Sequence, residues 1–451
     1  MIVQALVVLL AQAAADMPPI AAAGLEGRPA SSAASPLQAR IDAAAEGAVI
    51  EVPPGTYRGD LTIDRRISLI GRGRPLLRGS GTGSVLRVRA AGVRIEGLDI
   101  DGGGGGDLGR DASGIHVAAR SVTIRDCRIA NSLFGVYLRE ADGATVEATT
   151  IRGIPGRDPG EKGSGIHVWN TQGFRLSGNT VIDVRDGFYI QSSSHGAIVG
   201  NTARDLRYGL HYMFSDDNVF EDNTFENGAA GTALMYSKRI VFRRNRFLHN
   251  RGFASVGLLL KACDEVVAES NLIADNARGI FLEGSYRNLF RGNVVAESDT
   301  AIVLYDSCGE NRFEGNSFVA NLTPLTLVGR RTDTRFDGNY WSGNDEPDLD
   351  GDGRSDRPYA LSSIFDHLRG NLTAADLFTE SLAASALGSA ERAFPVLEPA
   401  GAADGYPLVR PPELPRVPRA PAPARRAVAA GAIASLALLA GGAAVLWTAS
   451  R

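Results

Sequence analysis

The sequence predicts an all-β protein built on a right-handed parallel β-helix, a solenoid of about 22 residues per coil. The first observation is an Asn that recurs between positions 179 and 339 at steps of 22, 22, 22, 26, 22, 23 and 23 residues. The second is a set of short segments, mostly opened by Gly, such as GIHV, GFYI and GLHY, in which apolar residues alternate with others. Such period-2 alternation between turn residues indicates strands rather than helices.

Equal register in a β-helix means physical adjacency, because successive coils stack about 4.8 Å apart. The recurring Asn residues would therefore form an amide ladder along the axis. Apolar residues three positions before and two positions after each Asn would fill the core. The ladder positions are Asn179, Asn201, Asn223, Asn245, Asn271, Asn293, Asn316 and Asn339.

The segments on either side of the repeats predict the order of the domains. Residues 1–15 are apolar and end in an Ala-x-Ala pattern that is typical of a signal peptide, and a linker follows over residues 16–35. The β-helix is expected over residues 36–375, opened by a capping helix from about Pro36 to Glu46. A helical and then Pro-rich tail follows over residues 376–426. The uncharged residues 427–448 predict a C-terminal transmembrane helix, which would tether a periplasmic body to the inner membrane.

Composition excludes several classes of protein. The formal net charge is −4 and there is no run of Lys or Arg, so no nucleic-acid partner is expected. Three Cys residues without a C-x-x-C pair indicate neither a zinc ribbon nor a disulfide framework. Cys263 and Cys308 share a register with Ser193, Ser215, Ser237 and Ser285, and we expect all six to be stacked turn residues.

The middle residue of each Gly-opened strand is expected to point away from the core. Its column contains alternating His and Tyr, which predicts an exposed column formed by His116, Tyr137, His167 and Tyr189 and continued by His211. Successive His residues would lie two coils apart, about 9.6 Å, which is too far for two of them to share one metal ion.

Three soft donors share one stretch of this face. Met213 and Met235 have the same register on adjacent coils, and His211 precedes Met213 by two residues. Thioether and imidazole groups are donors that Cu(I) prefers, so His211, Met213 and Met235 are candidate copper ligands. The alternative is structural, since Met side chains often fill irregular gaps and His and Tyr stack on sheets.

The stretch DLDGDGRSD contains closely spaced carboxylates around a Gly turn. Such an arrangement suits Ca²⁺, with Asp348, Asp350, Asp352 and Asp356 as candidate ligands. Position twelve of the pattern is Tyr359 rather than the Glu of an EF-hand, so a solvated acidic turn is the alternative.

An enzyme that acts on uronate polysaccharides is the alternative function, because β-helices host many lyases, epimerases and hydrolases. His195, Asp216 and Asp217 lie on nearby coils and would be its candidate residues. The Gly-His-Gly motif of polygalacturonases and the Asp-Pro-His-Asp motif of alginate epimerases are absent from the sequence. We therefore expect the acidic pair to be a turn and the protein to have no catalytic residues.

Several motifs together resemble the NosD family, periplasmic proteins that take part in the maturation of nitrous-oxide reductase. They are GLHYMFSDDNVFEDNTF, the Asn repeats, NYWSGND with DLDGDGRSDRPY, and the tail with ERAFPVLEP and YPLVRPPELP. The resemblance covers about residues 36–415. It implies a carbohydrate-binding/sugar-hydrolase-like β-helix that does not hydrolyse sugar. The C-terminal Ala-rich span departs from the family's usual form.

The resemblance also implies partners and cargo. A membrane permease and a cytoplasmic ATPase would form an ABC-type complex with the β-helix, which would receive Cu(I) from a lipoprotein chaperone and pass it to apo nitrous-oxide reductase. The apolar end of the outward column, Leu259, Phe281 and Val303, is then a candidate docking strip, or a surface that the tail helix around residues 374–394 covers.

Overall fold

The computed structural model describes residues 35–103, 112–252, 254–329, 331–361, 402–412 and 414–419. The chain divides into two compact units, Met1–Pro415 and Arg416–Arg451, and the fold below is that of the first. Within the described ranges, no helix is both long and apolar enough to cross a bilayer. The expected signal peptide, nearly all of the linker and the expected transmembrane helix lie outside those ranges.

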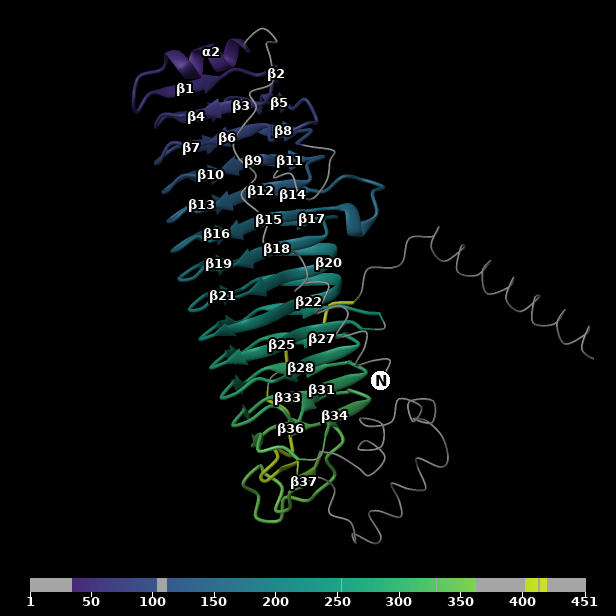
Figure 1. The fold of residues 1–451 in the computed structure, drawn as a ribbon. Coiled ribbons are helices and arrows are strands. Elements are labelled where there is room, and N and C mark those ends of the chain that lie inside the picture. The colour runs from purple at the N-terminus through teal and green to yellow at the C-terminus, as the bar shows by residue number, and fades with distance from the viewer. Residues whose placement is uncertain are drawn as a thin grey trace, which may run out of the picture. The chain divides into compact units, whose positions relative to one another are not determined.

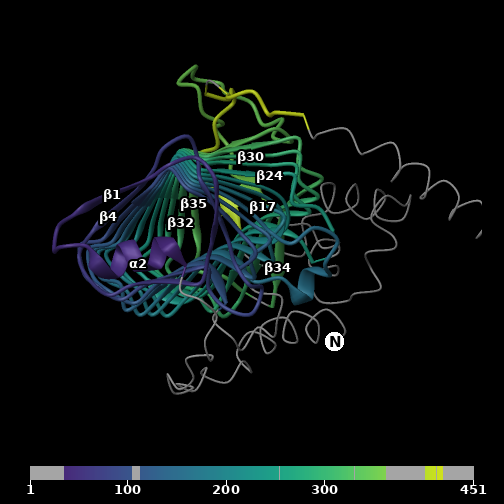
Figure 2. The ribbon, with the colours of Figure 1, turned by 90° about the horizontal axis from the view of Figure 1, so that it is seen from above.

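The first unit is a parallel β-helix, as the repeats predict, and its strands form three columns (Figure 1). Viewed from above in Figure 2, the coils overlie one another. The first column pairs in parallel from β1 to β35. Its strands are β1 (Val49–Val52), β4 (Ser68–Gly71), β7 (Arg94–Glu96), β10 (Thr123–Arg125), β13 (Thr145–Glu147), β16 (Arg175–Ser177), β19 (Ala197–Val199), β21 (Val219–Glu221), β23 (Val241–Arg243), β26 (Val267–Glu269), β29 (Leu289–Arg291), β32 (Arg312–Glu314) and β35 (Arg335–Asp337).

The second column follows the turn that contains the repeated Asn. Its strands are β2 (Thr56–Arg58), β5 (Leu76–Arg78), β8 (Asp99–Asp101), β11 (Arg128–Ala130), β14 (Thr150–Arg152), β17 (Thr180–Ile182), the first part of β20 (Thr202–Met213), the first part of β22 (Thr224–Lys238), β24 (Arg246–Leu248), β27 (Leu272–Ala274), β30 (Val294–Ala296), β33 (Ser317–Val319) and β36 (Tyr340–Trp341).

The third column contains the Gly-opened strands of the middle coils and the strands that stack before and after them. They are β3 (Leu61–Ile63), β6 (Leu86–Val88), β9 (Ser113–Val117), β12 (Phe134–Arg139), β15 (Ser164–Trp169), β18 (Asp186–Gln191), the later parts of β20 and β22, β25 (Val256–Asp264), β28 (Arg278–Glu283), β31 (Thr300–Tyr305) and β34 (Thr323–Val328). Because β20 and β22 continue without a break from the second column into the third, these two coils join the columns into one sheet.

The predicted amide ladder is confirmed. Each buried Asn donates a hydrogen bond from Nδ2 to Oδ1 of the next, over 2.9 Å from Asn201 to Asn223 and again from Asn223 to Asn245. The same Oδ1 also accepts the backbone N–H of the preceding Asn. The residue just before each ladder Asn has a positive φ, which explains the frequent Gly there, as at Gly200 with φ 64°.

Stacked apolar side chains fill the interior, as predicted. The rings of Phe220 and Phe242 lie 4.8 Å apart in the first column, and those of Phe225 and Phe247 lie 5.6 Å apart in the second. All four are fully buried. The Gly that opens a strand is required by close packing, because a Cβ at Gly209 would lie 2.5 Å from the carbonyl oxygen of Gly231 and 2.7 Å from the Phe225 ring.

A helix covers the N-terminal end of the β-helix, as predicted. α2 (Pro36–Ala43) buries Leu37 and Ile41 against the first coil. The Gln38 side chain accepts the N–H of Thr62 and donates to its carbonyl group, so it continues the backbone pairing of the open edge. The helix is shorter than predicted, because the backbone turns extended at Ala44.

The C-terminal end is closed by a segment that the sequence did not predict. β38 (Ala403–Asp404) pairs with β35 and with β37 (Tyr359–Ala360), so part of the expected tail belongs to the last coil. The fully buried Asp404 accepts hydrogen bonds from Asn339 Nδ2 at 2.8 Å and from Trp341 Nε1 at 3.0 Å. Asp404 therefore ends the Asn ladder.

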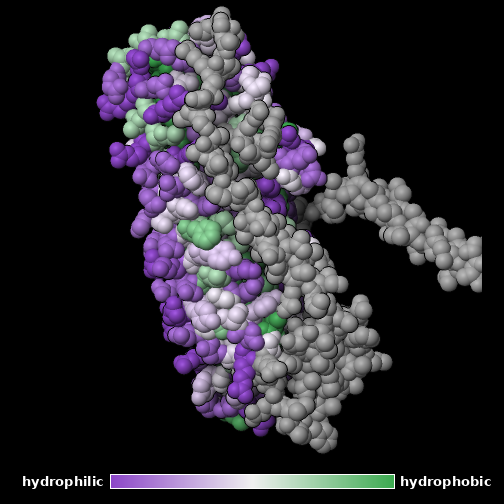
Figure 3. Space-filling model, in the orientation of Figure 1, coloured by the Kyte–Doolittle hydropathy of each residue, from purple (hydrophilic) through white to green (hydrophobic). Residues whose placement is uncertain are grey.

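Hydrophilic side chains predominate over the described coils on the face shown in Figure 3. Ion pairs connect neighbouring coils on the outside of the β-helix. Arg243, for example, lies 3.2 Å from both Glu221 and Glu269, which belong to the coils before and after it. Such exposed pairs contribute little stability individually, but alternating signs avoid repulsion between coils.

Candidate functional site

The predicted soft donors come together in the third column. Met213 on β20 and Met235 on β22 are directly paired in register, and both side chains are buried. His211 lies on the same face of β20 as Met213, since the intervening Tyr212 points into the core and is fully buried. These two are the only Met residues in the described parts of the chain, and adjacent coils bring them side by side.

The column of alternating His and Tyr also forms, but the prediction that it is exposed is wrong. Tyr137, His167 and Tyr189 retain only 5%, 9% and 8% of their exposure, and His116 is half-buried. The rings of Tyr137, His167 and Tyr189 each contact the rings of the coils before and after them. The ring centroids of successive residues from His116 to His211 lie 5.3, 4.5, 4.4 and 4.7 Å apart.

Flanking side chains complete the burial of this column. The Phe134 ring packs against Tyr137 at 5.6 Å and against His167 at 5.4 Å. Burial holds the pKa of His167 down to about 3 and, with the nearby arginines, that of His116 to about 4, so both imidazoles are neutral near pH 7.

An acidic residue that the sequence analysis missed supports His211. Asp186 at the start of β18 is fully buried, and its Oδ2 lies 3.3 Å from His211 Nδ1. Arg207 holds the same carboxylate with two hydrogen bonds of 3.0 and 2.8 Å. Burial opposes ionisation of Asp186, but the hydrogen bond to His211 and the neighbouring guanidinium groups keep its pKa well below the usual value.

This arrangement determines which nitrogen of His211 is available. When Nδ1–H donates to Asp186, the lone pair of the neutral ring is on Nε2. Nε2 is buried and has no hydrogen-bond partner among the described residues. A carboxylate that orients a His through one ring nitrogen while the other faces a metal is the usual second partner of metal-bound imidazole.

Tyr189 connects the His/Tyr column to the thioether pair. Its hydroxyl group lies 3.7 Å from Met213 Sδ and 2.9 Å from Gln191 Oε1. Burial raises the pKa of Tyr189 to about 12, so the hydroxyl stays protonated and can donate to either atom. One buried imidazole nitrogen and two thioethers therefore share a face on adjacent coils, where they suit a soft monovalent ion.

The predicted docking strip is buried rather than exposed. Phe281 and Val303 retain 4% and 6% of their exposure, and Leu259 is half-buried. They pack in one cluster with Ala230 and Val256, and the Phe281 ring lies 5.4 Å from that of Tyr305. Side chains from other coils of the same column thus pack against the strip. The tail helix that was the alternative cover lies outside the described residues.

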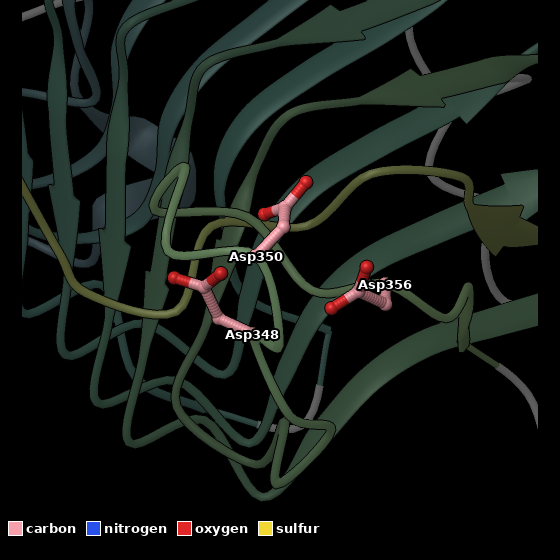
Figure 4. A group of neighbouring side chains, drawn as sticks. All are labelled: Asp348, Asp350 and Asp356. Atoms are coloured by element: carbon pink, nitrogen blue, oxygen red, sulfur yellow. The ribbon is translucent and has the colours of Figure 1, made fainter.

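The acidic loop brings together three of its four predicted ligands (Figure 4). One oxygen each from Asp348, Asp350 and Asp356 lies within 4.8 Å of the others. The group does not include Asp352, whose Oδ1 accepts the backbone N–H of Arg354 at 2.8 Å. Asp348 accepts the N–H groups of Gly351 and Gly353, which shape the loop around the cluster.

The acidic pair considered for catalysis is a turn, as expected. Asp217 forms a two-bond ion pair with Arg239 at 2.7 and 2.8 Å, and Asp216 accepts the backbone N–H of Lys238. His195 is exposed on the neighbouring turn. The cysteine prediction is also confirmed, since Cys263 N–H donates to Ser285 Oγ and Ser285 N–H donates to Cys308 Sγ in one ladder.

Comparison with curated proteins finds two similar relatives. The chain is 31% identical over 134 residues to the probable ABC transporter binding protein NosD of Pseudomonas aeruginosa, and 30% identical over 138 residues to the protein of the same name from Stutzerimonas stutzeri. Each alignment covers 30% of this chain and 31% of the relative. The chain thus spans about a third of the length of the curated relatives it matches.

Solved structures share the fold at low sequence identity. The A-module of mannuronan C-5 epimerase AlgE6 from Azotobacter vinelandii is 17% identical, with a TM-score of 0.58 over 66% of this chain and 93% of that one. A family 28 exopolygalacturonase from Yersinia enterocolitica is 12% identical, with a TM-score of 0.52 over 66% of this chain and 73% of that one.

A family model matches the middle of the chain. Residues 148–346 match the family described as periplasmic copper-binding protein (NosD). These residues include β15, β18, β20 and β22, and so the whole of the cluster around His211. The resemblance inferred from the motifs is therefore confirmed by the match of residues 148–346 to the NosD family model and by the two similar NosD proteins.

Proposed function

We propose that this chain is a periplasmic, non-catalytic component of an ABC-type assembly that binds Cu(I) transiently and passes it on for the maturation of nitrous-oxide reductase. The family description supports the compartment and the copper, and the names of the two relatives support the ABC context. ATP hydrolysis and membrane passage would belong to partner subunits, and a lipoprotein chaperone and the apo-reductase would be the copper donor and acceptor.

The observation that supports copper binding by this chain is the buried Nε2 of His211, held by Asp186, beside the register-paired Met213 and Met235. A thioether is a poor hydrogen-bond partner but a good Cu(I) ligand, so the set selects a soft ion over Zn²⁺ or Ca²⁺. The site is enclosed in this structure, which would protect Cu(I) from water and oxygen. Transfer to a partner would then require the face of β20 and β22 to become accessible.

A competition titration tests this proposal. Purified protein and a chromogenic chelator would compete for Cu(I) under anaerobic conditions. We expect the double variant His211→Ala with Met213→Ala to lose at least about tenfold in affinity, because two of three ligands are removed. His249→Ala is the matched control, since His249 is also buried and also pairs with a carboxylate, Asp275, at 2.8 Å. An unchanged affinity of the double variant would remove copper binding from this site.

A polysaccharide-acting enzyme is the second candidate function. The buried tyrosine and histidine, Tyr189 and His211, together with Asp186 favour it, because such groups can transfer protons, and the shared fold includes an epimerase and a polygalacturonase. Incubation with alginate and polygalacturonate would then release unsaturated or reducing ends, or change the uronate epimer ratio. Tyr189→Phe should abolish that activity, and an inactive wild-type protein would reject this function.

We also propose a structural Ca²⁺ ion at the loop of Asp348, Asp350 and Asp356. The convergence of three carboxylate oxygens within 4.8 Å supports it. The ion would link the loop after β36 to the segment that closes the last coil, where the Ser355 N–H donates to the Pro407 carbonyl group.

A further inference from the structure

Buried polar atoms without hydrogen-bond partners gather at one place on the β-helix. Ten such side-chain atoms occur in the parts of the chain that the structure describes. Four of them, Ser164 Oγ, His167 Nδ1, Arg185 Nε and His211 Nε2, come from three successive coils. Buried polar groups are normally paired, so a local group of polar atoms without protein partners is a candidate contact surface for a polar ligand or ion.

The positions of these atoms follow from the register. Ser164 and Asp186 are directly paired on β15 and β18, and so are His167 and Tyr189. The backbone N–H of Arg185 donates to the Gly163 carbonyl group, which places Arg185 beside the start of β15. Its Nε lies 3.4 Å from Asp186 Oδ2 without forming a hydrogen bond. Ser164, His167 and Arg185 therefore line the coil boundary next to Asp186.

The charges at this boundary do not balance. Two guanidinium groups, Arg185 and Arg207, face the single carboxylate of Asp186, whose oxygens are already bound by Arg207 and His211. The side chain of Arg185 is only 12% exposed, so water screens its charge poorly. Among the described residues, one positive charge is left over in a largely buried setting, which is costly unless an anion approaches.

The lowered pKa of His167 agrees with an excess of positive charge around it. Burial lowers its pKa most, and Arg185 lowers it further. A neutral His167 leaves the site with the net charge of one guanidinium group. That favours a singly charged anion over sulfate or hydrogen phosphate, which have two charges near pH 7.

The arrangement of the hydrogen-bond donors of Arg185 and Ser164 indicates which singly charged anion fits. The guanidinium group presents two parallel N–H donors along the edge that contains Nε, and a carboxylate matches that edge with its two oxygens. Ser164 supplies a hydroxyl donor on the adjacent coil. The stacked rings of His167 and Tyr189, with centroids 4.4 Å apart, provide an aromatic wall for the non-ionic part of a ligand.

We propose that Ser164, His167 and Arg185 form a binding site for a small monocarboxylate, one to two coils before His211 and Met213. This site goes beyond copper handling and does not depend on it. Acetate, lactate and galacturonate share the required chemistry, and they distinguish a simple organic acid from a sugar acid.

Isothermal titration calorimetry with the full chain, in the presence of a copper chelator, tests the proposal. We expect acetate, lactate or galacturonate to saturate the wild-type protein at or below about 10 mM. Arg185→Gln should weaken binding at least about tenfold, because the charged, two-oxygen contact is lost. Ser164→Ala should weaken it by a factor of about three to ten through the loss of one hydrogen bond.

Two controls keep the test interpretable. Ser164→Ala removes no hydrogen bond of the described structure, so it should fold normally even if Arg185→Gln does not. Arg239→Gln removes an exposed arginine that pairs with Asp217 elsewhere, and it should bind carboxylates as the wild type does.

Three outcomes would overturn the site. They are no carboxylate binding to the wild type, full affinity in Ser164→Ala and Arg185→Gln, and equal binding of sulfate and acetate. The last would indicate non-specific attraction of anions only. Because copper is chelated throughout, none of these outcomes bears on copper binding at His211.

Discussion

His211 Nδ1 lies 3.3 Å from Oδ2 of Asp186, a carboxylate that is fully buried one coil earlier in the β-helix. The contact orients the imidazole. Among the described contacts it leaves Nε2 as the ring nitrogen whose lone pair can bind a metal ion. The proposed copper site therefore depends on a residue that would not touch the metal.

Asp186→Asn tests this dependence. An amide can no longer serve as a charged acceptor for the imidazole N–H, so we expect the affinity for Cu(I) to fall by about tenfold or more. Asp275→Asn, at the separate pair with His249, should leave Cu(I) affinity unchanged. Circular dichroism would first establish that both variants are folded. If folded Asp186→Asn bound Cu(I) with the affinity of the wild type, Asp186 would have a structural role only.

The amide ladder should be a major source of stability. Asn223 donates two side-chain hydrogen bonds and accepts two more from Asn201, all of them buried. We expect Asn223→Ala to lower the free energy of unfolding by roughly 3 kcal/mol or more, because it also leaves buried partners unpaired. Chemical denaturation would measure the loss.

Thr224→Ala is the matched control for the ladder, because no side-chain hydrogen bond of Thr224 is described and the residue is half-buried on the outside of the same coil. Its effect should stay within about 1 kcal/mol. Equal effects of the two substitutions would mean that the ladder is not the stabilising element.

Acid should weaken the fold before carboxylates titrate. Burial, together with Arg87, Arg139 and Arg89, lowers the pKa of His116 from 6.5 to about 4. The folded state therefore binds fewer protons than the unfolded state between these values. The contribution of His116 is complete above about pH 6.5 and decreases as the pH falls toward 4.

The variant His116→Gln should flatten this part of the stability curve, by roughly 1 to 3 kcal/mol between pH 6.5 and 4. Urea denaturation at several pH values would measure it. The exposed His195 provides a control, and His195→Gln should keep the wild-type slope. A slope that His116→Gln does not change would show that other groups cause the acid sensitivity.

Calcium should stabilise the C-terminal coil if the acidic loop binds it. We expect millimolar Ca²⁺ to raise Tm by about 2–4 °C and a chelator to reverse the change. Asp356→Asn should remove the effect, whereas Asp352→Asn should preserve it, since Asp352 lies outside the cluster of three. A Tm that is insensitive to Ca²⁺ in the wild type would favour a solvated turn.

Sequence periodicity predicted the architecture and the register well, because like residues in successive coils must become neighbours. It placed Met213 beside Met235 and aligned the Asn ladder. It could not predict that Asp186 supports His211, since the same register contains Ser164 and Tyr208 in the adjacent coils and so shows no repeated signal.

The burial of the His/Tyr column and of Phe281 could not be predicted from the repeat. Alternation tells which face of a strand a side chain occupies, but not what packs on that face. Phe134 covers Tyr137 and His167 from a neighbouring register, and Tyr305 covers Phe281 in the same way. Neither contact has a signature in the repeat.

Asp404 is the last hydrogen-bond acceptor of the Asn ladder. Each Asn in the series both gives and receives a hydrogen bond, so duplicated repeats could be inserted anywhere before Asn339 without breaking the pattern. An ionised carboxylate can only accept hydrogen bonds, so Asp404 accepts one from Asn339 Nδ2 and has no side-chain N–H to donate to a further coil. Asp404 thus binds both the backbone N–H and the Nδ2 of Asn339, so these two donors are not available for pairing with the end of a second β-helix.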